Sequence, residues 1–247
     1  MKLLDKLISE KNTGHKGGIY HKLQIDFAYN SNHMEGSRLT HDQTRYIYET
    51  STVGISEGSE NIVRVNDIIE TVNHFRCFDY ILETIAEPIT ETYVKELHRI
   101  LKSGTVDTYA IIGEYKQEVN IVGETETALP EEVPEKMQKL LSTYDKPVLT
   151  LYDIAAFHVE YERIHPFYDG NGRTGRLLMF KQCLANDIVP FFIDEFHKMY
   201  YYLGLKEWQI EKKNERFINV CLSSQDFMKK IMDYFRIDYN HAPVTYQ

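Results

Sequence analysis

The sequence predicts an all-α fold that carries one small β-hairpin. Apolar residues recur three and four positions apart through most of the 247 residues, which is the spacing of a buried helix face. Only residues 114–130 depart from it, where Val119 and Ile121 between two flanking glycines predict a short extended hairpin. The length fits one large domain, or a core domain with an appended subdomain.

Helix signals follow one another from the N-terminus. The segment LQIDFAYNSNHM reads as a helix that ends near Glu35 and Gly36, and TxxQ at Thr40–Gln43 reads as a capping box that begins the next helix. Residues 51–61 are rich in Gly and Ser and are predicted to form a mobile loop. Apolar or aromatic stripes predict further helices over residues 68–82, 94–101, 137–144, 154–164, 177–184, 196–208 and 217–235.

The composition is that of an ordinary soluble protein, with 43% hydrophobic and 26% charged residues. The formal net charge of -9 argues against a nucleic-acid partner, because binding phosphates along a nucleic acid requires clustered Lys and Arg. Cys77, Cys183 and Cys221 lie far apart without a C-x-x-C pair, which predicts reduced core residues rather than a zinc site or a disulfide framework. No apolar run reaches the roughly 18 residues of a membrane span, so a cytoplasmic protein without a membrane partner is expected.

Residues 164–178, IHPFYDGNGRTGRLL, contain the pattern G-x-G-x-x-G. A dinucleotide-binding fingerprint would follow an apolar strand inside a βαβ unit, whereas the preceding IAAFHVEYERI carries a helical stripe. A P-loop would need Lys and then Ser or Thr where this chain has Arg176 and Leu177. Both interpretations are therefore rejected.

The same segment still predicts an anion site. Residues with permissive backbone angles just before an apolar helix leave N–H groups that converge at the positive end of the helix dipole. Gly170, Asn171, Gly172 and Gly175 are therefore interpreted as a phosphate cradle.

Charged side chains flank this cradle. Arg173 and Arg176 lie three apart on the following helix, so both guanidinium groups can emerge on one face and bind successive phosphates of one ligand. Asp169 is placed to bind a Mg²⁺ that bridges those phosphates, and His165 to act as a base for an incoming hydroxyl. Singly, such residues are more often core or solvated side chains, but their joint occurrence in so short a stretch favours a functional site.

The stretch HPFYDGNGRTGR resembles the signature of Fic proteins, HxFx(D/E)GNGRxxR, at every fixed position, and a looser similarity extends from about residue 90 to about residue 225. The resemblance implies the helical Fic (Fido) fold with a small hairpin flap. It implies an N-terminal helical region over residues 1–88, a catalytic core over 89–226 and a C-terminal helical extension over 227–247. It also implies transfer of AMP from ATP to a Ser, Thr or Tyr hydroxyl of a protein.

Three positions of the motif take their roles from this resemblance. His165 would be the general base that deprotonates the target hydroxyl. Asp169 would bind Mg²⁺ on the α- and β-phosphates of ATP. Phe167 would pack behind the catalytic histidine.

The phosphate contacts follow in the same way. Asn171 and the backbone of Gly170–Gly172 would form the anion hole of the nucleotide. Arg173 would hold the β-phosphate, and Arg176 would hold the γ-phosphate.

The later run KMYYYLGL resembles the family pattern R-x-x-Y-Y-x-x-L, with Tyr201, Tyr202 and Leu205 in place and Lys198 where Arg is usual. Tyr202 and Gln209 are interpreted as residues of the adenine pocket. The alternative is that this aromatic stripe is plain helix core.

A second resemblance concerns SNHMEG, Ser31–Gly36, which is similar to the inhibitory motif (S/T)xxxE(G/N) of many Fic proteins. Glu35 at a rigid helix end would pair bidentately with Arg176 and take the place of the γ-phosphate. The chain departs from the pattern at Ser37, where family members often have Asn.

The hairpin also has a counterpart in the family, which binds the target's acceptor segment as an added strand along the flap. The expected edge consists of Val119, Asn120, Ile121 and Val122. Shortness and nearby charges would keep such an edge from aggregating.

The resulting hypothesis is an autoinhibited protein adenylyltransferase that uses ATP and Mg²⁺ and modifies an unidentified protein, with itself as one candidate target. One alternative is a hydrolase that removes AMP from a modified protein, with Glu35 orienting a water molecule. Another is a nucleotide-responsive binding module without catalysis. A second copy of the chain is a further candidate partner, and whether the brake acts within or between chains is left open.

Overall fold

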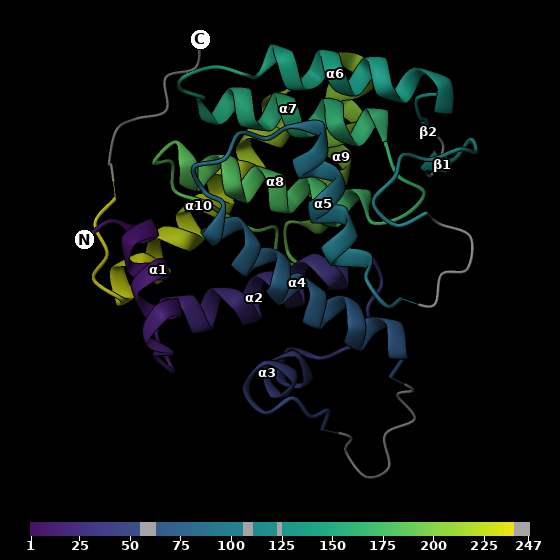
Figure 1. Cartoon of the computed structure of the whole chain (residues 1–247). Helices are drawn as coiled ribbons and strands as arrows, with labels where there is room; N and C mark the ends of the chain where they lie inside the picture. The colour runs from purple at the N-terminus through teal and green to yellow at the C-terminus, as the bar shows by residue number, and fades with distance from the viewer. Residues whose placement is uncertain (55–62, 106–110, 123–124, 240–247) are drawn as a thin grey trace.

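The computed structural model describes residues 1–54, 63–105, 111–122 and 125–239, and it confirms the predicted all-α fold (Figure 1). The α-helices in these residues are α1 (Leu3–Thr13), α2 (Ile19–Met34), α3 (His41–Thr50), α4 (Val65–Glu83), α5 (Glu91–Lys102), α6 (Val133–Thr143), α7 (Leu151–Ile164), α8 (Asn171–Ala185), α9 (Lys198–Lys206) and α10 (Glu215–Tyr234). A 3₁₀ turn, Pro130–Glu132, precedes α6, and a π-helical turn, Glu207–Glu211, follows α9. Most of the loop expected at 51–61 lies outside the described residues.

Helix α8 runs through the middle of the molecule in Figure 1 and packs against α2, α4, α5 and α7. Its sequence after the motif is apolar on nearly all sides, so most of its residues are buried, with Leu177, Leu178 and Phe180 in the main core. The N-terminal end of α8 lies beside the C-terminal ends of α2 and α5: Glu35, the C-cap of α2, contacts Arg176 of α8, and Lys102, the last residue of α5, contacts Asp169 just before α8.

The chain between α2 and α3 follows the predicted caps. Helix α2 ends at Met34, Glu35 is its C-cap, and Gly36 adopts a left-handed φ of 86° that glycine reaches without steric strain. Thr40 and Gln43 form the expected capping box at the start of α3. Glu35 is thus held at the end of a 16-residue helix.

The hairpin is shorter than the stretch 114–130 that predicted it. Strand β1 (Ile121–Val122) pairs antiparallel with β2 (Thr125–Glu126), with Ile121 opposite Glu126. Beyond these pairs, side-chain hydrogen bonds replace the backbone ladder: Thr127 Oγ1 donates to the carbonyl oxygen of Asn120 at 2.8 Å.

All three cysteines are buried and carry free thiols, as expected. Within the described residues, no helix combines the length and apolar character needed to cross a membrane.

Candidate active site

His165 is the residue that ends α7. It is the C-cap in a left-handed conformation with φ of 51°, and its backbone N–H donates to the carbonyl of Tyr161 at 2.9 Å. Burial, reinforced by the positive charge of Lys116, lowers the pKa of the imidazole to about 4. The ring is therefore neutral near pH 7 and able to accept a proton. Its Nδ1 is buried and has no hydrogen-bond partner among the described residues.

The loop from Phe167 to Gly170 is closed by the side chain of Asn171. Asn171 Oδ1 accepts the backbone N–H of Phe167, and Nδ2 donates to the Phe167 carbonyl, both at 2.8 Å. Gly170 is the N-cap of α8 and has a φ of 80°. The first backbone N–H groups of α8 have no hydrogen-bond partner within the helix, as at any helix N-terminus. The cradle predicted from the sequence is thus a helix N-terminus whose loop Asn171 stabilises.

Glu35 lies inside this cradle and pairs with Arg176. Arg176 Nη2 donates to Glu35 Oε1 at 2.7 Å and to the carbonyl of Ser31 at 2.8 Å, while Nε donates to Ser31 Oγ at 3.1 Å. The expectation of a bidentate pair was wrong, because Ser31 takes the second edge of the guanidinium group. Burial favours the neutral form of Glu35, but the charges of Arg176 and Arg173 and the hydrogen bond from Arg176 together outweigh it and lower the carboxyl pKa.

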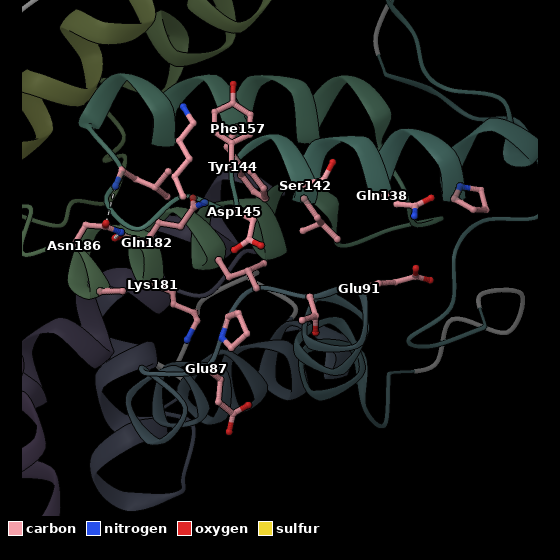
Figure 2. Close-up of a pocket in the computed structure, with 18 of the residues that line it drawn as sticks. Glu87, Glu91, Gln138, Ser142, Tyr144, Asp145, Phe157, Lys181, Gln182 and Asn186 are labelled. Atoms are coloured by element: carbon pink, nitrogen blue, oxygen red, sulfur yellow. Dashed lines mark hydrogen bonds between the residues drawn. The ribbon is translucent and has the colours of Figure 1, made fainter.

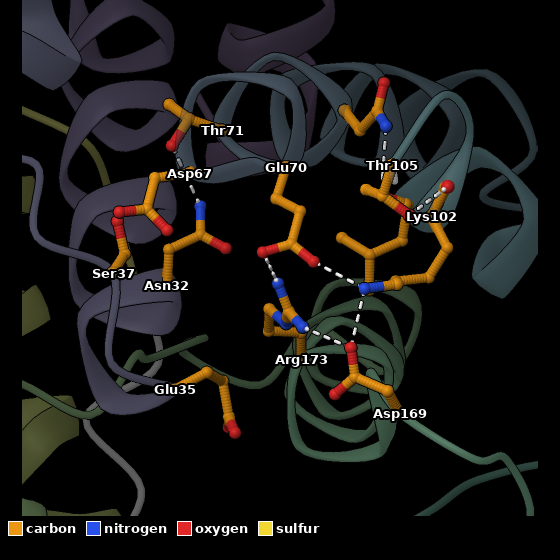
Figure 3. A network of polar contacts seen from close by, with 12 residues as sticks. Asn32, Glu35, Ser37, Asp67, Glu70, Thr71, Lys102, Thr105, Asp169 and Arg173 are labelled. Atoms are coloured by element: carbon orange, nitrogen blue, oxygen red, sulfur yellow. Dashed lines mark hydrogen bonds and ion pairs between the residues drawn. The ribbon is translucent and has the colours of Figure 1, made fainter. Parts of the chain in front are cut away.

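Arg173 belongs to a second, separate network, which Figure 3 shows. Its Nη1 forms an ion pair with Glu70 of α4, and its Nη2 donates to Asp169 Oδ2 at 3.3 Å. Lys102 of α5 donates to the same Asp169 oxygen and to Glu70, each at 2.6 Å. Each arginine of the motif is therefore held by a different carboxylate from the N-terminal half of the chain.

Asp169 has the properties required of a carboxylate that binds a hard cation. Burial would raise its pKa, but the charges of Arg173 and Lys102 lower it to about 2, and 47% of the side chain is exposed. No group of three or more His, Cys, Asp or Glu side chains that could hold a metal occurs in the described residues. A single carboxylate fits Mg²⁺, which proteins commonly bind through one or two carboxylates plus substrate phosphates.

The flap is tied to the motif by Asn120. Its Nδ2 donates to the Phe167 carbonyl at 3.2 Å, and its Oδ1 accepts from Lys116 Nζ at 2.6 Å. Of the four predicted edge residues, Val119, Ile121 and Val122 are exposed and Asn120 is half-buried.

Besides Glu70 and Lys102, two more residues that support the motif escaped the sequence analysis. His98 stacks on Phe167 with ring centroids 3.8 Å apart, and its Nε2 lies 2.9 Å from the carbonyl oxygen of Asp169. The buried Lys116 also binds the carbonyl of Pro166 through its backbone N–H at 2.8 Å. Neither has a local sequence signal, because both contacts depend on how distant segments pack.

The two residues assigned to an adenine pocket form hydrogen bonds with different helices, α2 and α7, and do not line a common cavity among those described. The Tyr202 hydroxyl donates to the carbonyl of Met34 at 3.3 Å, beside Glu35. Gln209 lies on the π-helical turn, where its side chain donates to the carbonyl of Val159 and lines a cavity of about 530 Å³ with Trp208.

The other pattern positions of KMYYYLGL, which are Lys198, Tyr201 and Leu205, make contacts within the fold. Lys198 Nζ donates to the His33 carbonyl at 3.4 Å, near the end of α2. Tyr201 and Leu205 are buried, and the Tyr201 hydroxyl lies 2.6 Å from His158 Nε2.

A cavity of about 910 Å³, shown in Figure 2, lies away from the motif. Its walls come from the α4–α5 connection, α6, the α6–α7 connection and the second half of α8, including Lys181, Gln182 and Asn186. No residue from 165 to 176 lines it. Cavity size therefore does not identify the candidate site, which rests on the motif geometry.

Comparisons with known proteins agree with this geometry. Residues 88–183 match the model of the Fic/DOC family. The protein adenylyltransferase Fic of Nematostella vectensis is 29% identical over 199 residues, which are 78% of this chain and 45% of that protein. The protein of the same name from Drosophila willistoni is 30% identical over 184 residues, 72% of this chain and 35% of that protein. The chain thus spans less than half the length of these relatives.

The fold also matches a solved structure. A Fic domain-containing signalling protein from Bacteroides thetaiotaomicron superimposes with a TM-score of 0.77 at 24% identity, over 97% of this chain and 99% of that one. The matched range 88–183 includes His165, Asp169 and both arginines of the motif. Residues 88–183 of the chain therefore form a Fic/DOC family domain.

Proposed function

We propose that this chain is a protein adenylyltransferase that transfers AMP from ATP to a hydroxyl group of a protein and is held inactive by Glu35. The observation that carries this proposal is the position of the Glu35 carboxylate, which pairs with Arg176 within the cradle at the start of α8. Both named relatives are protein adenylyltransferases, which supports the same activity here.

In the proposed reaction, the target hydroxyl attacks the α-phosphorus of ATP. A bond forms between the hydroxyl oxygen and the α-phosphorus, the bond to the β-phosphate oxygen breaks, and pyrophosphate leaves. The neutral imidazole of His165 takes the hydroxyl proton. The free N–H groups at the start of α8 stabilise the phosphates, and Asp169 would hold the Mg²⁺ that offsets their charge.

Inhibition follows from charge competition in this proposal. Arg176 is 2% exposed and already has the Glu35 carboxylate as its charged partner. A γ-phosphate oxygen needs the same guanidinium edge, so the productive nucleotide pose requires Glu35 to move away.

The exposed residues of the flap, Val119, Ile121 and Val122, would bind the target segment as an added strand.

Removal of AMP from a modified protein is the second candidate. Within the described residues, only the Oε1 oxygen of the Glu35 carboxylate forms a hydrogen bond, and 30% of the side chain is exposed. The second oxygen could therefore orient a water molecule at the cradle for hydrolysis.

Labelled ATP separates these activities. We expect Glu35→Gly protein incubated with ATP labelled at the α-phosphate and Mg²⁺ to become covalently labelled, while the double variant Glu35→Gly, His165→Ala does not. Loss of label from a premodified protein, abolished by Glu35→Gly, would instead establish the hydrolase. Reversible binding alone, in every variant, would reject both enzymes.

A further inference from the structure

Lys102 is a buried cation that touches the carboxylate proposed to hold Mg²⁺. It is the last residue of α5 and is 1% exposed, whereas lysine is almost never fully buried unless it is paired. Its Nζ lies 2.6 Å from Oδ2 of Asp169 (Figure 3). The burial of Lys102 keeps it from contacting a nucleotide, so it can act on the site only through its protein partners.

Glu70 fixes Lys102 in this position. Its two carboxylate oxygens bind different cations, Oε1 binding Lys102 and Oε2 binding Arg173. Because Asp169 Oδ2 also contacts both cations, the four side chains form a closed ring of alternating charge. The ring joins α4 and α5 to the start of α8, so the position of Lys102 is set by three packed helices.

The two oxygens of Asp169 have different surroundings. Oδ2 is engaged by Lys102 and Arg173, while the other oxygen points away from Lys102 in Figure 3. Asp169 is half-exposed, in contrast to the buried Lys102. The second oxygen therefore lies on the opposite side of the carboxylate from the lysine.

We propose that Lys102 is a positioning residue that orients Asp169 and weakens its attraction for free divalent cations, so that Mg²⁺ enters together with the nucleotide. A carboxylate whose charge is offset at 2.6 Å by an ammonium group attracts a second cation weakly. The phosphates of ATP then supply the missing negative charge and most of the ligands. This inference rests on the proposed function insofar as Asp169 is the metal-binding carboxylate.

The test measures metal binding without turnover. Mn²⁺ is titrated into the full chain in the absence of nucleotide, and free Mn²⁺ is followed by its electron paramagnetic resonance signal. We expect Lys102→Met and the more polar Lys102→Gln to bind Mn²⁺ about tenfold more tightly than wild type, the effect of removing one screened charge near a divalent ion. Lys102→Arg, which keeps the charge, should bind like wild type.

A matched variant shows whether the gain in Mn²⁺ affinity depends on Asp169. Adding Asp169→Asn to either neutral Lys102 variant should abolish the gain in Mn²⁺ affinity. Unchanged affinity in a folded Lys102→Met or Lys102→Gln protein, or a gain that survives Asp169→Asn, would overturn the inference. The Mn²⁺ titration does not measure AMP transfer. If the labelled-ATP experiment showed no activity, the Mn²⁺ affinities could still be interpreted.

Discussion

Gly172 and Glu35 approach so closely that no side chain on residue 172 could coexist with the observed carboxylate. A β-carbon on Gly172 would lie within 3.0 Å of Glu35 Oε1 and 2.9 Å from Nη1 of Arg176. Gly172 lies within α8 and, unlike Gly170, does not have a positive φ, so what its missing side chain provides is the space that the carboxylate of Glu35 occupies. In the proposed function, a phosphate bound to Arg176 would compete with Glu35 for this space.

Gly172→Ala should consequently destabilise the protein through Glu35. We expect a loss of about 1–3 kcal/mol in the free energy of unfolding, the usual range for overpacking a buried site. In a Glu35→Gly background the same substitution should have a much smaller effect, since the carboxylate it overlaps is absent. Urea unfolding of the four proteins measures the coupling. Equal losses in the two backgrounds would show that the close approach is unimportant.

The pKa of His165 predicts how AMP transfer depends on pH. With a pKa of about 4, the base remains neutral from pH 8 down to about 5, so the rate of the Glu35→Gly variant should be flat there and fall below about pH 4. His165→Ala should lose on the order of 10²–10⁴ in rate while still binding ATP. Initial rates with labelled ATP across this range provide the measurement. A decline that begins near pH 6.5 would contradict the desolvated environment assigned to the ring.

Two other buried histidines predict a loss of stability in acid. Burial, with the charge of Arg176, lowers the pKa values of His74 and His158 to about 3. The unfolded chain then binds more protons between pH 6.5 and 3, so the free energy of unfolding falls as pH falls through this window, by up to about 1.4 kcal/mol per pH unit for each histidine.

A substitution at His74 checks this assignment. Both ring nitrogens of His74 lack hydrogen-bond partners among the described residues, and the ring packs edge-on against Phe27. His74→Phe should therefore keep the fold and reduce the slope of stability against pH by up to about 1.4 kcal/mol per unit. Chemical denaturation at pH 7, 6, 5 and 4 gives the slope, and an identical slope in wild type and variant would rule out His74 as a contributor.

The sequence was sufficient for features that depend on local patterns. The apolar stripe of α4, the capping box at Thr40 and the turn after His165 each arise within a few residues, so the helices and the motif loop could be predicted. The domain boundaries at 88 and 226 remain predictions, and α10 runs across residue 226 without a break.

Contacts between distant helices could not be predicted in the same way. Glu70 and Lys102 lie far from the motif in sequence, and nothing local marks Lys102 as a partner of Asp169 or Glu70 as a partner of Arg173. The geometry of the Glu35 pair was also beyond the sequence, because the backbone carbonyl of Ser31 competes for Arg176. Such details depend on how α2, α4 and α5 pack against α8.

The most direct test of the account compares AMP transfer by wild type, Glu35→Gly and the double variant Glu35→Gly, Arg176→Ala under identical conditions. If the productive ATP pose is populated at about 1% in the wild type, Glu35→Gly should raise the rate about 100-fold, a coupling of roughly 2.7 kcal/mol. The double variant should lose that gain, because the proposed inhibition acts through Arg176 and the proposed phosphate contact is gone. A rate for Glu35→Gly at or below that of wild type, or a double variant as active as Glu35→Gly alone, would contradict inhibition by the Glu35–Arg176 pair.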